Sequence, residues 1–519
     1  MSGGFTWLDW AILAAAFAGT TVAGGRLAGR QRTYRDFFLG GRRLPWYAVS
    51  ASLVATEISA VTYISLPSVV CREGGNLTYL QIGLIGSFLA RLIVGYVLVP
   101  AYFRREIYSP YDYMGDRLGE RVRRLATVLF SLGGVLGQSA RVYLIAVVLE
   151  VVLHRELGWL HAHFGLDPLV AAVAVIGVAA VAWTLLGGIA AVVWTDFLLF
   201  LLFLAGIGIA LATAAAGVEG GLPAVLATGD AAGKLRLLDF DPDPAKAYTF
   251  WAALFAASWG GVGSYGTDQM LAQRLFCCRD EKAARRAIVA SIAAVGVIFL
   301  VALVGVALFA YYREHPLAGA ALDLVAADPD RLFPVFIVEA MPPGLKGVVL
   351  AGTFAAAISS LDSILAALAQ TSLSLGGTAR RGTGAVEPPA AARRAVRASR
   401  LLVAGWGLAL GAAAVGMRAV HAHYASILDL ALAMGSYTGG ALVACFFLAL
   451  RRRRGDGSGL LWSAPLSVLA VFALVWHQDA ARALTAGLAL ATLGLWGALR
   501  LRPAAAIAET MGVPLAEFY

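Results

Sequence analysis

Long apolar stretches alternate with short polar connections along almost the whole chain. A stretch of about 20 apolar residues is long enough to cross a bilayer as a helix, and such stretches recur here at short intervals. The pattern predicts an all-α polytopic membrane protein with about 13 transmembrane helices. The predicted spans are residues 5–25, 46–70, 78–102, 125–153, 168–187, 190–215, 248–265, 287–312, 346–374, 400–416, 425–450, 459–476 and 482–499.

Composition agrees with this interpretation. The chain has 519 residues, of which 60% are hydrophobic and 14% charged, whereas soluble domains use roughly 25% charged residues. The longest polar segments, 216–247 and 376–399, are too short and too rich in Gly, Ala and Pro to form a soluble core. The first span precedes an arginine cluster, the reverse of a signal peptide, so we expect it to be retained. The four cysteines suggest no disulfide framework.

The net charge of +9 reflects membrane topology rather than a nucleic-acid partner. Of the 41 Lys and Arg residues, 29 fall in alternate connections and termini on one side of the predicted membrane and 10 on the other. The arginine-rich side is expected to be cytoplasmic. This predicts a plasma-membrane protein with its N-terminus outside and its C-terminus inside. The clusters on the predicted cytoplasmic side are 26–43, 104–124, 274–286, 380–400 and 451–454.

Two spans carry residues that break helices, and they lie five spans apart. The second contains Pro67, and the seventh contains Gly260, Gly261, Gly263 and Gly266. Backbone groups freed at membrane depth must be satisfied by protein, water or a ligand, so paired breaks predict an inverted repeat around a midplane site. In the alternative interpretation, the glycines only allow close helix packing.

The segment 355–363 reads Ala-Ala-Ala-Ile-Ser-Ser-Leu-Asp-Ser, and it places polar groups inside an apolar helix. At helical spacing Ser359 and Ser363 lie one turn apart, with Asp362 beside them. Such oxygen ligands suit a hard monovalent cation. Serines can instead bond to their own helix, but the aspartate in the same turn favours ion binding.

Five ionisable residues fall within spans or at their edges, and each costs at least ~2.5 kcal/mol if it is central and unpaired. They are Glu57, Arg91, Arg141, Asp196 and Asp362. Glu57 and Arg141 could form a static ion pair. Alternatively, Arg141 could receive an anionic substrate while Arg91 holds Glu57. Asp196 lies near the cytoplasmic end of its span, where a carboxylate could reach water.

Six motifs follow one another along the chain, at residues 52–62, 109–119, 186–196, 267–274, 344–363 and 435–440. Together they resemble the sodium:solute symporter family across nearly the whole core. The resemblance implies a LeuT-type core of two inverted five-helix repeats with broken first helices. It implies the domains 1–45 (extra helix and cytoplasmic linker), 46–215 (first repeat), 216–247 (extracellular loop), 248–450 (second repeat) and 451–519 (two extra helices and cytoplasmic tail).

The resemblance also implies Na⁺ as the coupling ion, with no organic cofactor. The implied sodium site combines backbone carbonyls and hydroxyls of Ala55, Ile58, Ala356, Ser359 and Ser360. A possible second sodium site comprises Asp196, Ser359, Asp362 and Ser363. Asp362 stands where the family's sialic-acid transporters have a serine.

The implied substrate-binding residues are most similar to those of the family's sialic-acid branch, which binds carboxylates. Arg141 is the discriminating residue, because a guanidinium binds a carboxylate through two hydrogen bonds. The implied substrate-binding residues are Glu57, Ser59, Thr62, Gln81, Arg141, Trp259, Ser264 and Tyr265, the last three forming a gate or wall.

The sequence therefore predicts a sodium-coupled symporter that imports a small polar, carboxylate-bearing solute by alternating access. A sodium/sugar symporter, a proton-coupled symporter or a membrane sensor that kept the fold remain alternatives. A membrane enzyme would need histidines and acids clustered at one face, but the seven histidines all map to the outer surface, far in sequence from the membrane carboxylates. We expect a monomer or loose homo-oligomer in lipid, with no nucleic-acid partner.

Overall fold

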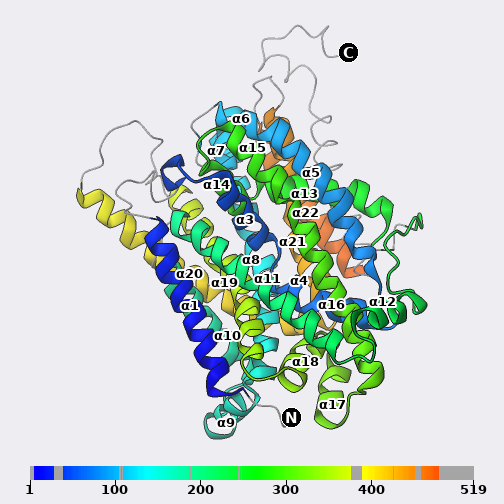
Figure 1. The fold of residues 1–519 in the computed structure, drawn as a ribbon. Helices are drawn as coiled ribbons and strands as arrows, with labels where there is room; N and C mark the ends of the chain where they lie inside the picture. The colour runs from blue at the N-terminus through cyan, green and yellow to red at the C-terminus, as the bar shows by residue number, and fades with distance from the viewer. Residues whose placement is uncertain are drawn as a thin grey trace.

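The computed structural model shows a bundle of helices (Figure 1), with no strand in the parts of the chain it describes. The predicted all-α membrane architecture is confirmed. The described residues are 5–28, 39–104, 107, 109–185, 189–243, 246, 248–375, 389–424, 426–450 and 457–477.

The helices follow one another with short connections. Those of the first half are α1 (Trp7–Ala28), η1 (Gly40–Arg42), α3 (Trp46–Glu57), α4 (Ala60–Cys71), η2 (Leu77–Tyr79), η3 (Ile82–Ser87), α5 (Phe88–Ile93), η4 (Val94–Leu98), α6 (Val99–Phe103), α7 (Pro110–Leu118), α8 (Glu120–Val152), α9 (His154–Phe164), α10 (Pro168–Thr184), α11 (Ile189–Ala216) and α12 (Gly221–Ala231). Those of the second half are η5 (Ala252–Ala257), α13 (Ser258–Val262), η6 (Gly263–Thr267), α14 (Gln269–Phe276), α15 (Glu281–Ala290), η7 (Ser291–Ala293), α16 (Ala294–Glu314), α17 (Gly319–Ala327), η8 (Pro329–Arg331), α18 (Leu332–Ala340), α19 (Leu345–Leu375), α20 (Pro389–His421), α21 (Ile427–Leu450), η9 (Gly457–Gly459) and α22 (Leu460–His477).

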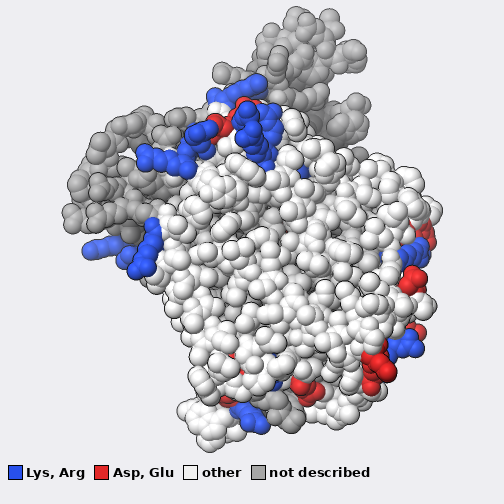
Figure 2. Space-filling model, in the orientation of Figure 1, with Lys and Arg blue, Asp and Glu red and all other residues white. Residues whose placement is uncertain are grey.

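Among the described residues, eight helices are long and apolar enough to cross a membrane, or up to ten if each bent pair is one span. The bent pairs are α3 with α4, at 54°, and α9 with α10, at 113°. A broad band almost without charged side chains crosses the visible face, and Lys and Arg gather at the end where α6, α7 and α15 lie (Figure 2). The count of 13, the membrane orientation and the five domain boundaries stay predictions, and the span at 482–499 lies outside the described residues.

The second span is broken, but not at the predicted residue. Helix α3 ends at Glu57, and Ile58 and Ser59 adopt non-helical backbone angles (ψ 84° and 169°) before α4 begins. Pro67 lies inside α4, where the helix continues through it. A membrane helix tolerates a proline when neighbouring groups satisfy the freed carbonyl. The polar residues at the break, not the proline, mark the point where this helix unwinds.

The seventh span is interrupted at Asp268, which is extended (φ −74°, ψ 125°) between η6 and α14. The glycine cluster that begins at Gly260 lies in helical turns before this point. A Cβ added at Gly261 would lie 2.6 Å from a side-chain atom of α5, and one at Gly266 would lie 2.2 Å from a side-chain atom of η4. The glycines therefore serve close helix packing, and the prediction that they break the helix is wrong.

The first helix is fixed to α19 by a buried carboxylate. Asp9, 1% exposed, accepts hydrogen bonds at Oδ1 from the backbone amides of Gly344 (2.7 Å) and Gly347 (3.0 Å). Amides at a helix N-terminus lack intrahelical partners and favour negative charge. Helix α1 thus caps the helix that carries the predicted ion ligands.

Gly347→Ala is expected to loosen this contact. The added Cβ would lie 2.7 Å from the backbone oxygen of Asp9, so α1 and α19 must move apart, at a cost of about 1–3 kcal/mol. The thermal unfolding midpoint in detergent measures the loss. Gly405→Ala on α20 is the matched control, because its Cβ meets no atom within 4 Å. Equal midpoints for the two variants would contradict the packing argument.

Candidate functional site

The break in the second span leaves a helical carbonyl without its usual partner. The Ser59 amide donates to the Glu57 carbonyl oxygen (2.9 Å). In a continuous helix the same amide would bond to the carbonyl of Ala55. Because the amide is directed elsewhere, the Ala55 carbonyl is available for another ligand at membrane depth.

Hydroxyls of α19 face this break. Ser360 Oγ lies 3.2 Å from the Ala356 carbonyl oxygen and 3.5 Å from that of Thr56, so it links α19 to α3. Ser359 Oγ is buried beside Asp196 and lacks a hydrogen-bond partner of normal geometry among the described residues. Unwound carbonyls beside hydroxyls are a common sodium environment in transporters. The five residues predicted for the first site are all buried: Ala55, Ile58, Ala356, Ser359 and Ser360.

The predicted second sodium site contains an arginine. Arg274 Nη2 lies 2.9 Å from Asp196 Oδ2, and both side chains are 1% exposed. The same guanidinium donates to Ser52 Oγ (2.8 Å) and to Ser363 Oγ, while Ser52 Oγ donates to Asp196 (2.6 Å). Asp196 therefore does not reach water, although its place near the cytoplasmic end of its span suggested that it could. Its carboxylate is buried because α14 brings a positive charge to it.

Asp362 belongs to the same cluster. It is 2% exposed, and Ser363 Oγ lies 3.1 Å from its Oδ1. Two carboxylates thus share a region with one guanidinium. Local sequence patterns do not predict this arrangement, because Arg274 follows its span in an arginine cluster expected to be cytoplasmic and lies 78 residues from Asp196.

Glu57 is held by Arg91 rather than by Arg141. Arg91 Nη2 forms an ion pair with Glu57, and Tyr265 Oη donates to Glu57 Oε1 (2.6 Å). The Arg91 guanidinium lies 4.3 Å from the centre of the Tyr265 ring, and its Nε donates to Ser291 Oγ (2.9 Å). This network joins the end of α3 to η6, so Glu57 has a structural partner and does not neutralise Arg141.

Arg141 lies near the middle of α8 and forms no ion pair with a described carboxylate. Its Nη1 is buried without a hydrogen-bond partner among the described residues. Its acidic neighbour is Asp268, the residue at the break of the seventh span. Gln138, one turn earlier on α8, is 5% exposed, and its Oε1 also lacks a described partner. Sequence analysis missed Gln138, although a glutamine three residues before a membrane arginine was a usable signal.

Among the other predicted substrate residues, Thr62 is linked to Arg141 through a tyrosine. Thr62 is buried in the first turn of α4, and Ser59 is buried at the residue before this helix. The Thr62 hydroxyl lies beside Tyr79, which is in turn an electrostatic neighbour of Arg141. The break of the second span, Tyr79 and α8 therefore meet in one polar region.

The remaining predicted residues lie elsewhere. The Gln81 amide is bound by backbone: Nε2 donates to the Tyr248 carbonyl (3.0 Å), and Oε1 accepts from the Asp239 amide (3.2 Å). Ser264 is exposed. Trp259 stacks on Phe447 of α21, with ring centres 4.8 Å apart. None of these three is brought to Arg141 by the contacts described.

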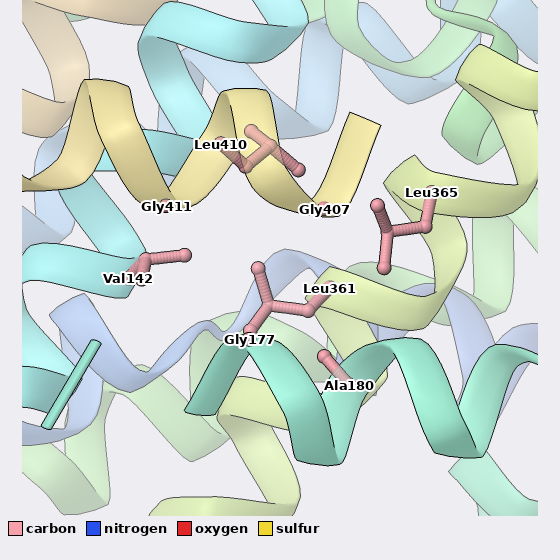
Figure 3. A pocket seen from close by; sticks show the side chains of 8 residues that line it. All are labelled: Val142, Gly177, Ala180, Leu361, Leu365, Gly407, Leu410 and Gly411. Carbon is pink, nitrogen blue, oxygen red and sulfur yellow. The ribbon is translucent and has the colours of Figure 1, made fainter. Parts of the chain in front are cut away.

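A pocket between α8, α10, α19 and α20 is apolar throughout (Figure 3). It adjoins polar side chains of α8 and α19 but contains none of them. Val142 directly follows Arg141 on α8, and Leu361 directly precedes Asp362 on α19. It offers no group to orient a charged solute. Its lining residues are Val142, Gly177, Ala180, Leu361, Leu365, Gly407, Leu410 and Gly411.

Comparison with known proteins agrees with this geometry. The sequence profile of the sodium:solute symporter family matches residues 37–466. The chain belongs to this family. Its members are sodium-coupled transporters and not enzymes, so the expected class of protein is confirmed and Na⁺ is the expected coupling ion.

Several relatives carry anions. The bovine sodium-coupled monocarboxylate transporter 2 is 30% identical over 370 residues, which is 70% of this chain and 56% of that protein. The Xenopus laevis sodium-coupled monocarboxylate transporter 1 is 28% identical over 457 residues, or 86% and 68%. The human sodium/iodide cotransporter is 30% identical over 371 residues, or 70% and 54%. The chain thus spans little more than half the length of some of these relatives.

Solved structures support the fold. A Na⁺-coupled sialic acid symporter in a substrate-bound outward-open state superposes with a TM-score of 0.75 at 24% identity, covering 96% of this chain and 99% of that one. A nucleobase-cation-symport-1 family transporter gives a TM-score of 0.52 at 14% identity, covering 92% and 95%. At such identities the likeness concerns the fold alone, and the expected LeuT-type architecture is confirmed.

Proposed function

We propose that this chain is a sodium-coupled symporter that imports a small monocarboxylate across the plasma membrane by alternating access. The observation that carries the proposal is Arg141 of α8, whose Nη1 is buried without a hydrogen-bond acceptor among the described residues. A buried donor without an acceptor is unfavourable, and a carboxylate substrate supplies that acceptor. The names of the relatives support the same class of solute.

We propose that the substrate carboxylate binds between Arg141 and Gln138 on α8, with Ser59 and Thr62 of α4 across from them. Glu57 and Tyr265 act as structural supports, because the Arg91 network holds both. Gln81, Trp259 and Ser264 then act away from the carboxylate, as parts of the wall or gate.

Sodium is proposed to bind at the first site, between the break after α3 and the hydroxyls of α19. There it links the two helices and favours the conformation in which they meet. Opening toward the cytoplasm separates them, weakening the set of oxygen ligands and releasing both cargoes. If sodium tightens substrate binding, substrate must tighten sodium binding by the same factor.

At the second predicted site, we propose that Arg274 supplies the positive charge that a second sodium ion would bring. Its guanidinium already bonds to Asp196 and Ser363, two of the four predicted ligands. A sodium ion would have to displace it. We therefore expect a single sodium ion per cycle and a Hill coefficient near one for sodium activation.

The proposal is tested by the thermal stability of the purified protein with a panel of solutes, in sodium and in choline. A ligand that binds only the folded state raises the unfolding midpoint. We expect short-chain monocarboxylates to raise it in sodium but not in choline, and sugars to leave it unchanged. Stabilisation by sugars or by iodide, with none by carboxylates, would overturn the solute assignment.

Ser360→Ala is expected to raise the sodium concentration for half-maximal uptake by about tenfold, since one oxygen ligand and the link to α3 are lost. Sodium titration of uptake in proteoliposomes measures this change. Ser467→Ala is the control, because among the described residues this buried hydroxyl bonds only to the Ala464 carbonyl of its own helix (2.8 Å). Unchanged sodium activation in Ser360→Ala would exclude this hydroxyl as a ligand.

A further inference from the structure

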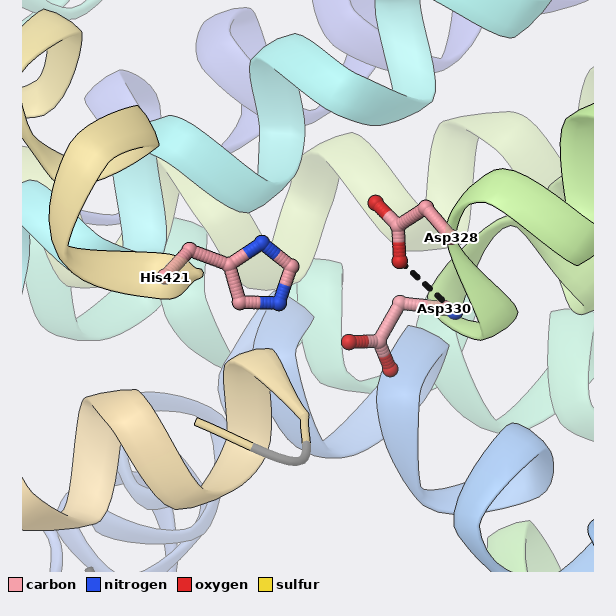
Figure 4. Close-up of side chains that lie close together, drawn as sticks. All are labelled: Asp328, Asp330 and His421. Atoms are coloured by element: carbon pink, nitrogen blue, oxygen red, sulfur yellow. Dashed lines mark hydrogen bonds between the residues drawn. The ribbon is translucent and has the colours of Figure 1, made fainter. Parts of the chain in front are cut away.

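A second group of polar side chains contains none of the residues proposed for the sodium and substrate sites. Asp328 and Asp330 flank the start of η8, and His421 ends α20 (Figure 4). One ligand atom from each of the three side chains lies within 4.8 Å of the other two. Residues about 90 positions apart in the sequence therefore direct two carboxylates and an imidazole toward one point.

Asp330 is the most buried member of the group. It is 2% exposed, its Oδ2 accepts a hydrogen bond from the Ile427 amide (2.7 Å), and no described Lys or Arg forms an ion pair with it. Ser65 Oγ lies beside this carboxylate, is 0% exposed and lacks a hydrogen-bond partner of normal geometry. A buried carboxylate without a cation is unfavourable. The site is therefore short of one positive charge.

The other two members are oriented by their surroundings. The Tyr143 hydroxyl lies 3.3 Å from Nδ1 of His421, which fixes the ring and leaves its other nitrogen free. Asp328 Oδ1 accepts from the Asp330 amide (3.1 Å), and its Oδ2 lies 3.8 Å from Arg331 Nε. Arg331 itself is engaged by Glu150 (2.9 Å). Hydrogen-bonded ligands of this kind are typical of protein metal sites.

We propose that Asp328, Asp330 and His421 bind a divalent transition-metal ion of the Zn²⁺ type. One imidazole nitrogen and two carboxylate oxygens make a three-ligand set, with water in the fourth position. Zn²⁺ bonds of about 2.0–2.2 Å place tetrahedral ligand atoms about 3.4 Å apart. Because the three ligand atoms lie within 4.8 Å of one another, the group must close by up to about 1.4 Å. Ca²⁺ prefers six to eight oxygens and suits the set less well.

The bound ion would clamp η8, between α17 and α18, to the end of α20. We expect it to stabilise the protein and to slow transport, because alternating access requires helices to shift relative to one another. The effect on transport rests on the proposed function, whereas metal binding and stabilisation do not. A failure of the symport proposal would therefore leave the metal site testable.

The test is the unfolding midpoint of the purified full chain at fixed pH, with Zn²⁺ or Ca²⁺ added after treatment with a chelator. We expect Zn²⁺ at micromolar concentration to raise the midpoint of the wild type by about 2 °C or more, and Ca²⁺ to leave it unchanged. His421→Ala and Asp328→Asn should abolish the rise. His423→Ala, at an exposed histidine two residues away, should retain it.

If Asp330→Asn folds, it tests the most buried of the three proposed ligands. If it does not fold, the result for His421→Ala decides whether the three residues bind the ion. Tyr143→Phe should weaken Zn²⁺ binding by about tenfold, because the ring loses its orienting contact. A Zn²⁺ response that persists in His421→Ala would place the ion on other histidines and overturn the proposal. An equal response to Ca²⁺, or none to Zn²⁺, would do the same.

Discussion

Arg141→Gln is expected to lower sodium-driven uptake of a monocarboxylate by at least about 100-fold. The guanidinium can give a carboxylate two charge-assisted hydrogen bonds, each worth about 1.5–3 kcal/mol, and 1.4 kcal/mol is a factor of ten in affinity. Arg141→Lys should recover only part of the loss, because an ammonium keeps the charge but not the planar pair of donors. Uptake into proteoliposomes measures both variants.

Stabilisation by sodium alone should persist in Arg141→Gln, because the proposed sodium ligands lie on α3 and α19. Arg418→Gln is the matched control, since it removes an arginine that pairs with Asp167 at an exposed position (2.8 Å). Uptake by Arg141→Gln at the wild-type rate would exclude Arg141 as the substrate receptor. Loss of the sodium response as well would indicate that the fold had changed.

Asp196→Leu is expected to lower the free energy of unfolding by about 3–5 kcal/mol, because it leaves the Arg274 guanidinium buried with less compensating charge. The double variant Asp196→Leu with Arg274→Met should regain part of this loss, since the pair is then replaced by apolar groups. Denaturant unfolding in detergent measures both variants.

Asp241→Ala provides the control for this series. Its ion pair with Lys246 lies at the surface, where side chains are 32% and 52% exposed, and its removal should change stability by no more than about 1 kcal/mol. A similarly small effect of Asp196→Leu would show that the buried pair is not a structural centre. The region around Asp362 would then again be a candidate site for a second sodium ion.

Much of the fold could be predicted because hydropathy is a local property. The spans at 46–70 and 346–374 correspond to α3 with α4 and to α19. The exact positions of the helix breaks could not be predicted, because they depend on which freed backbone groups the neighbouring helices can satisfy. Pro67 continues its helix, whereas Asp268 interrupts one, because its side chain accepts a hydrogen bond from the Met270 amide (2.7 Å) and caps α14.

The sequence singles out buried polar residues but does not show which of them pair, and their sodium-binding and substrate-binding roles stay predictions. By sequence, Glu57 can pair with either Arg91 or Arg141, and only the tertiary structure, which brings Arg91 of α5 to the end of α3, decides for Arg91. Arg274 was assigned to the cytoplasmic side by its place at the end of a span, yet α14 turns it inward to Asp196. Pairings of this kind join residues far apart in the sequence, which local patterns cannot connect.

The most direct test of sodium coupling is uptake of a radiolabelled short-chain monocarboxylate into proteoliposomes that hold the purified full chain. An inward sodium gradient is compared with an equal choline gradient and with a proton gradient alone. The account predicts accumulation above the external concentration only with sodium, and its collapse when a sodium ionophore is added. Equal uptake in choline, or accumulation driven by the proton gradient alone, would contradict sodium-coupled symport.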